Sequence, residues 1–247
     1  MSFKVVIPAR YASSRLPGKP LLDIAGKPMV IRVAEQAQKS GAEAVVIATD
    51  FDKIVQVAEE HHVDAVMTRV DHQSGTDRIA EVAQNLNWDN DDIVVNVQGD
   101  EPLIDPALIQ EVALTLAHSR DAVMATACHA IHDEASMLNP NVVKVVMDAD
   151  GNAMYFSRSP IPYPRDEAHK KSLKAHRHIG IYAYRVGFLK QYAELSVTQL
   201  EQIESLEQLR VLHHGYKIAI TVTVHAPATG VDTQADLDYV RSVFQAS

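Results

Sequence analysis

The stretch "VVIPARYASSRLPGKPL" at residues 5–21 decides the fold class, because it joins a buried strand to a loop rich in cations. The segment "FKVVIP" is apolar at consecutive positions, which is typical of a strand buried on both faces. The loop that follows contains Arg10, Arg15 and Lys19, with small residues and two prolines among them. In open α/β sheets, ligands bind beyond the carboxyl ends of the strands, where we expect this loop to lie.

Strands and helices alternate from this stretch to about residue 130. Further apolar strands are predicted at "AEAVVIATD", "DAVM", "DIVVNVQGD" and "AVMATAC". Amphipathic helices are predicted between them, at "PMVIRVAEQAQKSG", "DKIVQVAEEHH", "TDRIAEVAQNL" and "PALIQEVALTLAHS". This alternation predicts an α/β protein with a mostly parallel sheet covered by helices on both faces.

The pattern changes after residue 130. Two strands around a turn at Asp150-Gly151 are predicted in "NVVKVVMDADGNAMYFSR", and further strands in "RHIGIYAYR" and "KIAITVTV". The segment "TQLEQIESLEQLRVLHHG" predicts one helix, with a capping box of Thr198 and Glu201 and a closing Gly215. A last helix is predicted at "TQADLDYVRSVFQ". We expect a mixed sheet with a small antiparallel extension, and a separate lobe is the alternative for the extra strands.

Composition limits the partners of this protein. The 247 residues carry a net charge of −9 with histidine neutral, which disfavours nucleic acid and anionic membranes as partners. The single cysteine, Cys128, excludes an intrachain disulfide, and its apolar surroundings predict a buried, inert thiol. Because strand-like residues begin at Phe3 and no apolar run is long enough to span a membrane, we expect no signal peptide, no membrane insertion and a cytoplasmic location.

The first loop has the composition of a phosphate-binding loop. Phosphate binding requires backbone N–H groups, small residues for close approach and fixed positive charge. Ala9, Gly18 and the neighbouring small residues meet the first needs, and Arg10, Arg15 and Lys19 meet the last. An ordinary solvated loop is the alternative. No GxGxxG or Walker A pattern is present, which disfavours a nicotinamide enzyme and a P-loop ATPase.

Carboxylates follow two other predicted strands or loops. Asp100 and Glu101 end the strand in "NVQGDEP", a position suited to Mg²⁺, which takes one or two carboxylates plus water and phosphate oxygens. Asp232 is either a second ligand or the N-cap of the last helix. Ser74 and Gly75 begin another helix, where they form either a binding edge or a plain cap.

These segments, in this order, resemble the 3-deoxy-manno-octulosonate (KDO) cytidylyltransferase family. The resemblance covers nearly the whole chain and rests on "IPARYASSRLPGKPL", "HQSGTDRIAE", "VNVQGDEP", "NPNVVKVVMD", "YFSRSPIP", "RHIGIYAYR", "LEQLRVL" and "GVDTQADL". The related sialic acid cytidylyltransferases carry a first loop of the form "ARGGSKG", from which "ARYASSRLPGK" departs. The individual motifs are weak, and their ordered set is specific.

The resemblance implies a reaction and an architecture. CTP and KDO would give CMP-KDO and pyrophosphate with Mg²⁺, and the product would donate KDO in lipopolysaccharide synthesis. The implied fold is a Rossmann-like nucleotidyltransferase, usually a homodimer. The chain would form a single domain, with a nucleotide-binding half at residues 1–130 and a half for sugar binding and dimerisation at residues 131–247.

The resemblance also implies site residues, position by position. The catalytic group would be Arg10, Arg15, Lys19 and Asp100, of which the three cations hold the triphosphate. Four residues would line the cytidine pocket: Ala9, Ser74, Gly75 and Arg78. The Mg²⁺ ligands would be Asp100 and Asp232. Six residues would face the sugar, with Arg158 as the candidate partner of its carboxylate: Gln98, Arg158, His178, Tyr182, Glu207 and Gln208.

Two other functions remain open at this point. One is a nucleotidyltransferase that acts on a different acid sugar, such as an amino analogue of KDO. The other is a nucleotide-binding regulator that has lost catalysis. Lys19, Asp100 and Asp232 are all present, whereas a regulator would typically lack one of these groups.

Overall fold

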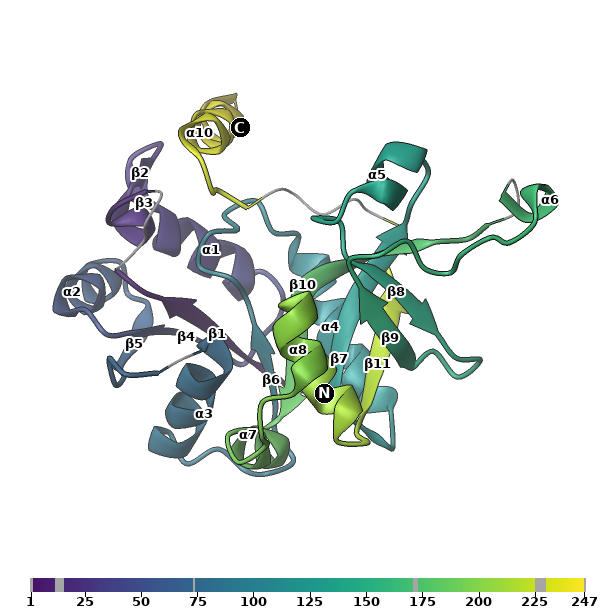
Figure 1. The fold of residues 1–247 in the computed structure, drawn as a ribbon. Coiled ribbons are helices and arrows are strands. Elements are labelled where there is room, and N and C mark those ends of the chain that lie inside the picture. The colour runs from purple at the N-terminus through teal and green to yellow at the C-terminus, as the bar shows by residue number, and fades with distance from the viewer. Residues whose placement is uncertain (1, 12–15, 73, 171–172, 225–229, 247) are drawn as a thin grey trace.

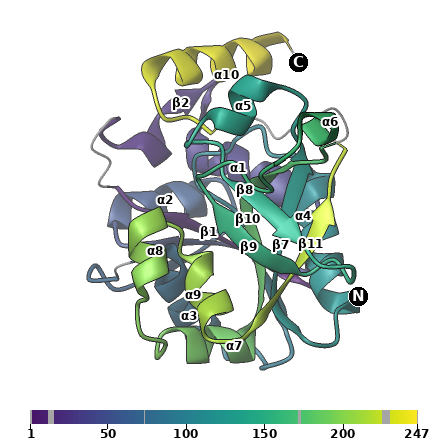
Figure 2. The same cartoon turned by 45° about the vertical axis from the view of Figure 1, so that its right-hand side comes forward.

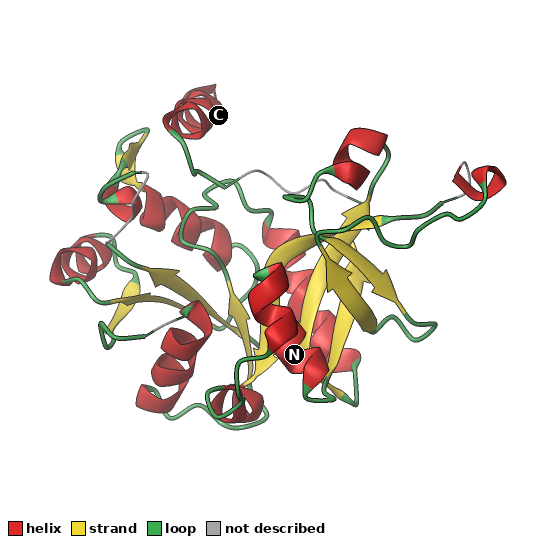
Figure 3. Cartoon of the chain, viewed as in Figure 1, coloured by secondary structure: helices red, strands yellow, loops and turns green. Residues whose placement is uncertain are grey.

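The structure is a computed structural model that describes residues 2–11, 16–72, 74–170, 173–224 and 230–246. A twisted central sheet runs through the molecule, with helices packed on both of its faces (Figures 1 and 3). In the described part of the chain this sheet has nine strands, and seven of them lie in the order β11-β7-β10-β6-β1-β4-β5. This arrangement confirms the predicted α/β class.

The strands on the β1 side of the sheet are parallel. β1 (Lys4–Ala9) lies between β4 (Ala44–Thr49) and β6 (Ile93–Asn96), and β5 (Asp64–Met67) forms the edge. β7 (Ala122–Ala130) pairs in parallel with β11 (Lys217–Val222). β10 (His176–Arg185) runs antiparallel between β6 and β7 and so joins the two groups. The carboxyl ends of β1 and β6 therefore lie at the same edge of the sheet. The first loop, which follows β1, begins at this edge, as expected.

Each face of the sheet is covered by its own set of helices. An apolar cluster on one face includes residues of α1 (Met29–Gln38), α2 (Asp52–Glu60) and α4 (Pro106–His118). A second cluster on the other face includes α3 (Gly75–Asn85), α7 (Val186–Tyr192) and α9 (Gln208–His213). Cys128 is fully buried in the second cluster, and burial raises the pKa of its thiol to about 12, so the predicted inert thiol is confirmed.

The remaining elements extend this core. β8 (Lys144–Met147) pairs with β10 and with β9 (Ala153–Ser157), which forms the expected antiparallel extension. The connections carry α5 (Glu134–Leu138) and α6 (Glu167–Lys170), and α6 stands away from the sheet in Figure 1. At the other side, α10 (Gln234–Ala246) contacts β2 (Asp23–Ile24), which pairs with β3 (Lys27–Pro28), and η1 (Lys19–Leu21) contacts α1.

One predicted element is wrong. The helix expected from Thr198 to Gly215 is divided into α8 (Gln199–Glu204) and α9 (Figure 2), and α9 contacts β9. Ser205 interrupts it with a left-handed backbone, φ 51° and ψ 51°. The capping box of Thr198 and Glu201 is present, and Gly215 follows with φ +80°. Leu200 and Ile203 of α8 are 40% and 70% exposed, whereas Leu206 and Leu209, which follow the break, are buried.

The described residues include no helix with both the length and the apolar content needed to cross a bilayer.

Candidate active site

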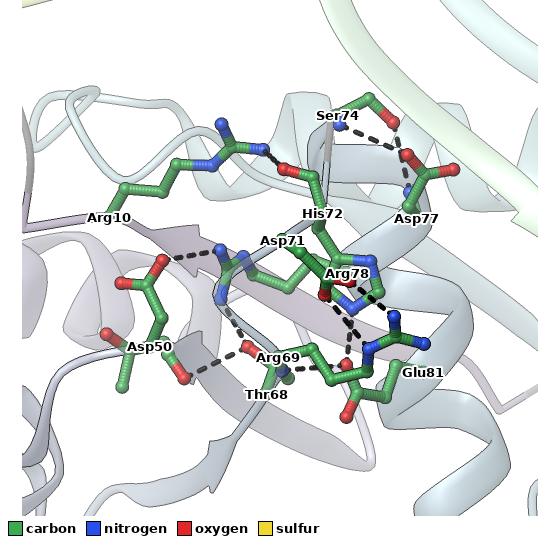
Figure 4. Close-up of polar contacts among 11 residues, drawn as sticks. Arg10, Asp50, Thr68, Arg69, Asp71, His72, Ser74, Asp77, Arg78 and Glu81 are labelled. Atoms are coloured by element: carbon green, nitrogen blue, oxygen red, sulfur yellow. Dashed lines mark hydrogen bonds and ion pairs between the residues drawn. The ribbon is translucent and has the colours of Figure 1, made fainter.

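The first loop leaves β1 at Ala9, which is buried at the end of the strand. Arg10 is exposed, and its Nη2 donates a hydrogen bond to the main-chain oxygen of His72 at 3.0 Å (Figure 4). Arg15 lies outside the described residues. Gly18 precedes η1 with φ +67°, a conformation that favours glycine. This turn directs the chain back towards the sheet and places Lys19 at the start of η1.

Lys19 contacts two acids from distant parts of the chain. Its Nζ lies 2.5 Å from Asp100 Oδ2 and 3.2 Å from Asp232 Oδ1. The Lys19 side chain is 12% exposed, whereas those of Asp100 and Asp232 are 37% and 49% exposed. The three groups therefore form one cluster at the edge of the sheet, with the carboxylates open to solvent.

The backbone explains why these segments meet. A Cβ at Gly99 would lie 2.8 Å from the Pro8 oxygen, so only glycine allows the end of β6 to approach β1 this closely. Val231, fully buried against α10, donates its N–H to the Asp100 oxygen at 2.8 Å. These two contacts hold Asp100 between the first loop and the segment that carries Asp232.

Thr233, the neighbour of Asp232, caps the start of α10, the role that the sequence leaves open for Asp232. Thr233 Oγ1 accepts a hydrogen bond from the Asp236 N–H, and Asp236 Oδ2 accepts bonds from the N–H groups of Asp232 and Thr233. Thr233 and Asp236 thus form a reciprocal cap at the start of α10. The carboxylate of Asp232 points instead to Lys19.

The two carboxylates suit a magnesium ion bound with a substrate. The oxygens of Asp100 and Asp232 converge on one ammonium group, which shows that a single cation can contact both. The described residues contain no group of three or more His, Cys, Asp or Glu side chains arranged for a metal. A set of two carboxylates completed by phosphate oxygens and water is the arrangement that Mg²⁺ prefers. The donor set therefore fits the ion that the sequence predicts.

Glu101, beside Asp100, has a different environment. Burial raises the pKa of its carboxyl to about 7, and the charge of Asp100 acts in the same direction. Of the two adjacent acids, Asp100 contacts Lys19, and Glu101 is the one whose ionisation is disfavoured by its surroundings.

The start of α3 forms a second wall. Ser74 and Asp77 make a capping box, with the Ser74 hydroxyl accepting from the Asp77 N–H at 3.1 Å (Figure 4). Arg78 is fully buried and pairs with Asp50 at 2.8 Å and with the Thr68 hydroxyl. Its guanidinium ties α3 to the ends of β4 and β5. In this structure Arg78 is therefore a buried support for the start of α3.

A pocket of about 340 Å³ lies between α3, β6, β10 and the α8–α9 segment. It brings together five of the residues expected from the sequence, namely Gly75, Gln98, Tyr182, Glu207 and Gln208. Ala9, Ser74, Arg78, Arg158 and His178 are absent from its lining among the described residues.

The pocket contains buried polar atoms without partners in the described structure. Asn96 Oδ1 and Gln208 Nε2 have no hydrogen-bond partner, and these residues are 5% and 3% exposed. Partial desolvation raises the pKa of Glu207, which keeps solvent exposure, and burial raises the pKa of Tyr182 well above its usual range. An unpaired buried acceptor and donor favour a ligand that supplies several hydroxyl groups.

Arg158 and His178 lie next to the pocket residues. His178 Nε2 is 2.9 Å from the Thr126 hydroxyl, and its ring packs against Phe156 and Tyr182. Burial lowers the pKa of His178 to about 3, so the imidazole is neutral at pH 7. Arg158 donates to the main-chain oxygens of Pro140, Glu204 and Ser205.

Several pocket residues escape the sequence analysis, among them Thr76, Asn96, Tyr184, Tyr192 and Ser205. A signal exists for two of them. Asn96 and Tyr184 each lie two positions from an expected residue, Gln98 and Tyr182, and period-two alternation places such pairs on one face. Ser205 has no such signal, because it enters the pocket through a break in a predicted helix.

Comparison with known proteins agrees with this geometry. The chain belongs to the cytidylyltransferase family, whose pattern matches residues 4–218. It is 59% identical over 249 residues to 3-deoxy-manno-octulosonate cytidylyltransferase of Neisseria gonorrhoeae strain NCCP11945, with 98% of each chain covered. The same enzyme of strain ATCC 700825 / FA 1090 gives the same values.

Solved structures show the same fold. A structure of CMP:2-keto-3-deoxy-manno-octonic acid synthetase complexed with CTP superposes with a TM-score of 0.92 and 44% identity, covering 100% of this chain and 99% of the other. A cytidylyltransferase from Leptospira borgpetersenii serovar Hardjo-bovis (strain JB197) has a TM-score of 0.64 and 17% identity, covering 100% and 88%. This second likeness concerns the fold alone.

Proposed function

We propose that this protein is a 3-deoxy-manno-octulosonate cytidylyltransferase that converts CTP and KDO into CMP-KDO and pyrophosphate. The observation that carries the proposal is 59% identity over 98% of both chains to an enzyme of that name. The cluster of Lys19, Asp100 and Asp232 beside a polar pocket supports it, because a nucleotide triphosphate and a sugar need such neighbouring sites.

The reaction is a nucleotidyl transfer. The anomeric hydroxyl of the sugar forms a bond to the α-phosphorus of CTP, the hydroxyl proton is lost, and the bond from the α-phosphorus to the bridging oxygen breaks as pyrophosphate leaves. Because negative charge builds up on the phosphate oxygens, the protein contributes mainly alignment and fixed positive charge. Arg10, Arg15 and Lys19 would supply that charge from the first loop.

Asp100 and Asp232 would hold Mg²⁺ at this site. When bound, the ion lowers the pKa of a coordinated hydroxyl and offsets charge on phosphate oxygens. Lys19 keeps the two carboxylates close together through its ammonium group, which reduces their mutual repulsion. This pairing prepares the ligand set before substrate arrives.

The pocket would receive the sugar. Gln98, Tyr182, Glu207 and Gln208 present amide, hydroxyl and carboxyl groups that suit sugar hydroxyls. His178 is neutral at pH 7, is absent from the pocket lining and packs against Tyr182, so it supplies no charge to the sugar carboxylate. Arg158 retains donors beyond its three main-chain contacts and stays the candidate for that carboxylate. Ala9, Ser74 and Gly75 would meet the cytidine.

Assembly and cellular context extend the proposal. We propose a homodimer, because a groove of about 460 Å³ near α5 is bordered by Leu138 and Tyr163, whose side chains are 61% and 80% exposed. Light scattering at micromolar concentration tests this assembly. A cytoplasmic location and a role in lipopolysaccharide synthesis would follow from the proposed reaction.

A pyrophosphate-release assay tests the function directly. Purified protein with Mg²⁺ is offered KDO and each of the four nucleoside triphosphates, then CTP and a panel of acid sugars that includes an 8-amino KDO analogue and sialic acid. We expect turnover with CTP and KDO. Turnover only with another nucleotide or sugar contradicts the proposal, and tight CTP binding without pyrophosphate release favours a regulator.

A further inference from the structure

The break between α8 and α9 presents a short segment to the pocket. Ser205, Leu206, Glu207 and Gln208 all line it. The break depends on the left-handed backbone of Ser205, a conformation that is unfavourable for a residue with a Cβ atom. Neighbouring contacts must therefore hold it.

Glu204 supplies the main contact. Its Oε1 accepts a hydrogen bond from the Ser157 hydroxyl at 2.6 Å, and its Oε2 accepts one from the Arg158 N–H at 2.9 Å. Both partners lie at the end of β9, 46 or 47 positions earlier in the chain. The carboxylate thus joins the end of α8 to the antiparallel extension.

The side chain of Arg158 also bonds to Glu204 and Ser205. Nε donates to the Glu204 oxygen at 2.6 Å, and Nη2 donates to the Ser205 oxygen at 3.4 Å. These are the main-chain oxygens on either side of the helix break. The side chain and backbone of Glu204 are therefore both fixed by Arg158, and Ser205 is fixed with them.

Lys144 holds the backbone of Arg158 from the buried side. It is fully buried, and its Nζ donates to the oxygens of Asn139, Val142 and Arg158 at 3.0, 2.6 and 2.6 Å. All three donors of the ammonium group are thereby used. Because Arg158 is held on this side by Lys144, it is a firm support for the segment at residues 204–208.

We propose that Glu204 is a positioning residue for substrate binding, which fixes the 205–208 segment so that Glu207 and Gln208 face the acid sugar. Ser157, Arg158 and Lys144 support it. This inference rests on the proposed function, since it requires the segment to contact the sugar. Glu204 is absent from the pocket lining, so it acts through its neighbours.

Steady-state kinetics of four variants test the role of Glu204. Glu204→Ala should raise KM for the sugar about tenfold or more while KM for CTP stays within about twofold, because only the sugar side is displaced. Glu204→Gln keeps one acceptor for the Arg158 N–H and one donor for Ser157, and should retain KM within about threefold of the parent. Ser157→Ala should give an intermediate rise, and the exposed Gln202→Ala on α8 is the matched control.

A second readout separates positioning from loss of folding. Amide hydrogen exchange at residues 205–208 should quicken in Glu204→Ala while β6 and β10 keep their protection. If Glu204→Ala fails to fold, Ser157→Ala and Glu204→Gln are used instead. In these variants too, the change in KM for the sugar is compared with the change in KM for CTP. Equal changes in both KM values, or unchanged kinetics in a folded variant, would overturn the inference.

The proposed function is tested separately in the same experiment by Gln208→Ala. If this variant raises KM for the sugar and Glu204→Ala does not, the positioning role fails and the sugar site stands. If Gln208→Ala leaves KM for the sugar unchanged, the assignment of the pocket to the sugar fails and the inference falls with it.

Discussion

Lys19 Nζ lies 2.5 Å from Asp100 Oδ2, although 81 positions separate the two residues in the chain. A third group, Asp232 Oδ1, lies 3.2 Å from the same nitrogen and is 213 positions away from Lys19. A surface loop of unrelated charges would show no such convergence. Under the proposed function, this cluster is where we expect the triphosphate and its metal ion to bind.

Lys19→Ala should lower kcat by about 10²-fold or more, as expected for the loss of one preorganised group that stabilises developing charge. The variant also leaves two carboxylates facing each other without an ammonium group between them. Pyrophosphate release at saturating substrates measures the effect. Lys39→Ala, at the exposed end of α1, is the control, and near-normal turnover by Lys19→Ala would exclude this residue from the mechanism.

Asp100→Asn should abolish activity that depends on Mg²⁺ while the protein stays folded, because an amide is a poor ligand for this ion. Turnover is measured across a magnesium titration, and circular dichroism checks the fold. Asp121→Asn, whose parent side chain is 73% exposed, should behave as the parent. Parent-like turnover of Asp100→Asn in EDTA would contradict the metal assignment.

Stability should fall as pH is lowered through the range in which His178 titrates in the unfolded chain. Burial lowers the pKa of His178 to about 3, so the unfolded state binds more protons between that value and about 6.5. The contribution is complete above about pH 6.5 and is lost as pH falls below it, by at most about 1.4 kcal/mol for each pH unit.

Urea unfolding at pH 7.5, 6.0 and 5.0 measures this loss. His178→Gln should reduce the slope of unfolding free energy against pH, since the glutamine does not titrate. His118→Gln, at the exposed end of α4, should leave the slope unchanged. Equal slopes for the parent and His178→Gln would rule out a buried neutral imidazole.

Asp50→Ala should destabilise the protein by about 3–5 kcal/mol, because it leaves the guanidinium of Arg78 buried without its charged partner. Figure 4 shows this guanidinium between Asp50 and Thr68, beneath the start of α3. Urea unfolding measures the change, with the exposed Asp64→Ala as control. A loss below about 1 kcal/mol, typical of a surface pair, would contradict a buried role for the pair.

Gln208→Met should raise KM for the sugar about tenfold without lowering the melting temperature. The substitution removes a buried donor that has no partner in the described structure, so the free protein loses no hydrogen bond. The bound sugar, by contrast, would lose one. Thermal unfolding and steady-state kinetics measure the two effects, and a lower melting temperature with unchanged KM would show that the amide serves the fold instead.

The sequence predicts most of the sheet because its signals are local. Apolar runs such as residues 5–7 and 93–95 determine buried strands without reference to the rest of the chain. The break at Ser205 is not predictable in this way, because it depends on Glu204 bonding to Ser157 and Arg158, which lie 46 or 47 positions away. Pattern alone favours a continuous helix there.

Some features of the candidate site are likewise predictable from the sequence, and others depend on distant contacts. The positions of Lys19 and Asp100 at the ends of strands follow from alternation and the rule for parallel sheets. The burial of Arg78 does not, because arginine is usually exposed and its burial here depends on the partners Asp50 and Thr68, which come from other elements. The cap formed by Thr233 and Asp236 likewise separates the two roles that the sequence leaves open for Asp232.

The antiparallel course of β10 has a mechanical consequence. This one strand pairs with β6, which leads to Asp100, and with β7, and its residues Tyr182, Ala183 and Tyr184 pair with both, so a rotation of one side of the sheet against the other would break hydrogen bonds on this strand. If the proposed substrates bind at this edge of the sheet, adjustment to them would fall to the connecting segments, such as residues 205–208, more than to the strands.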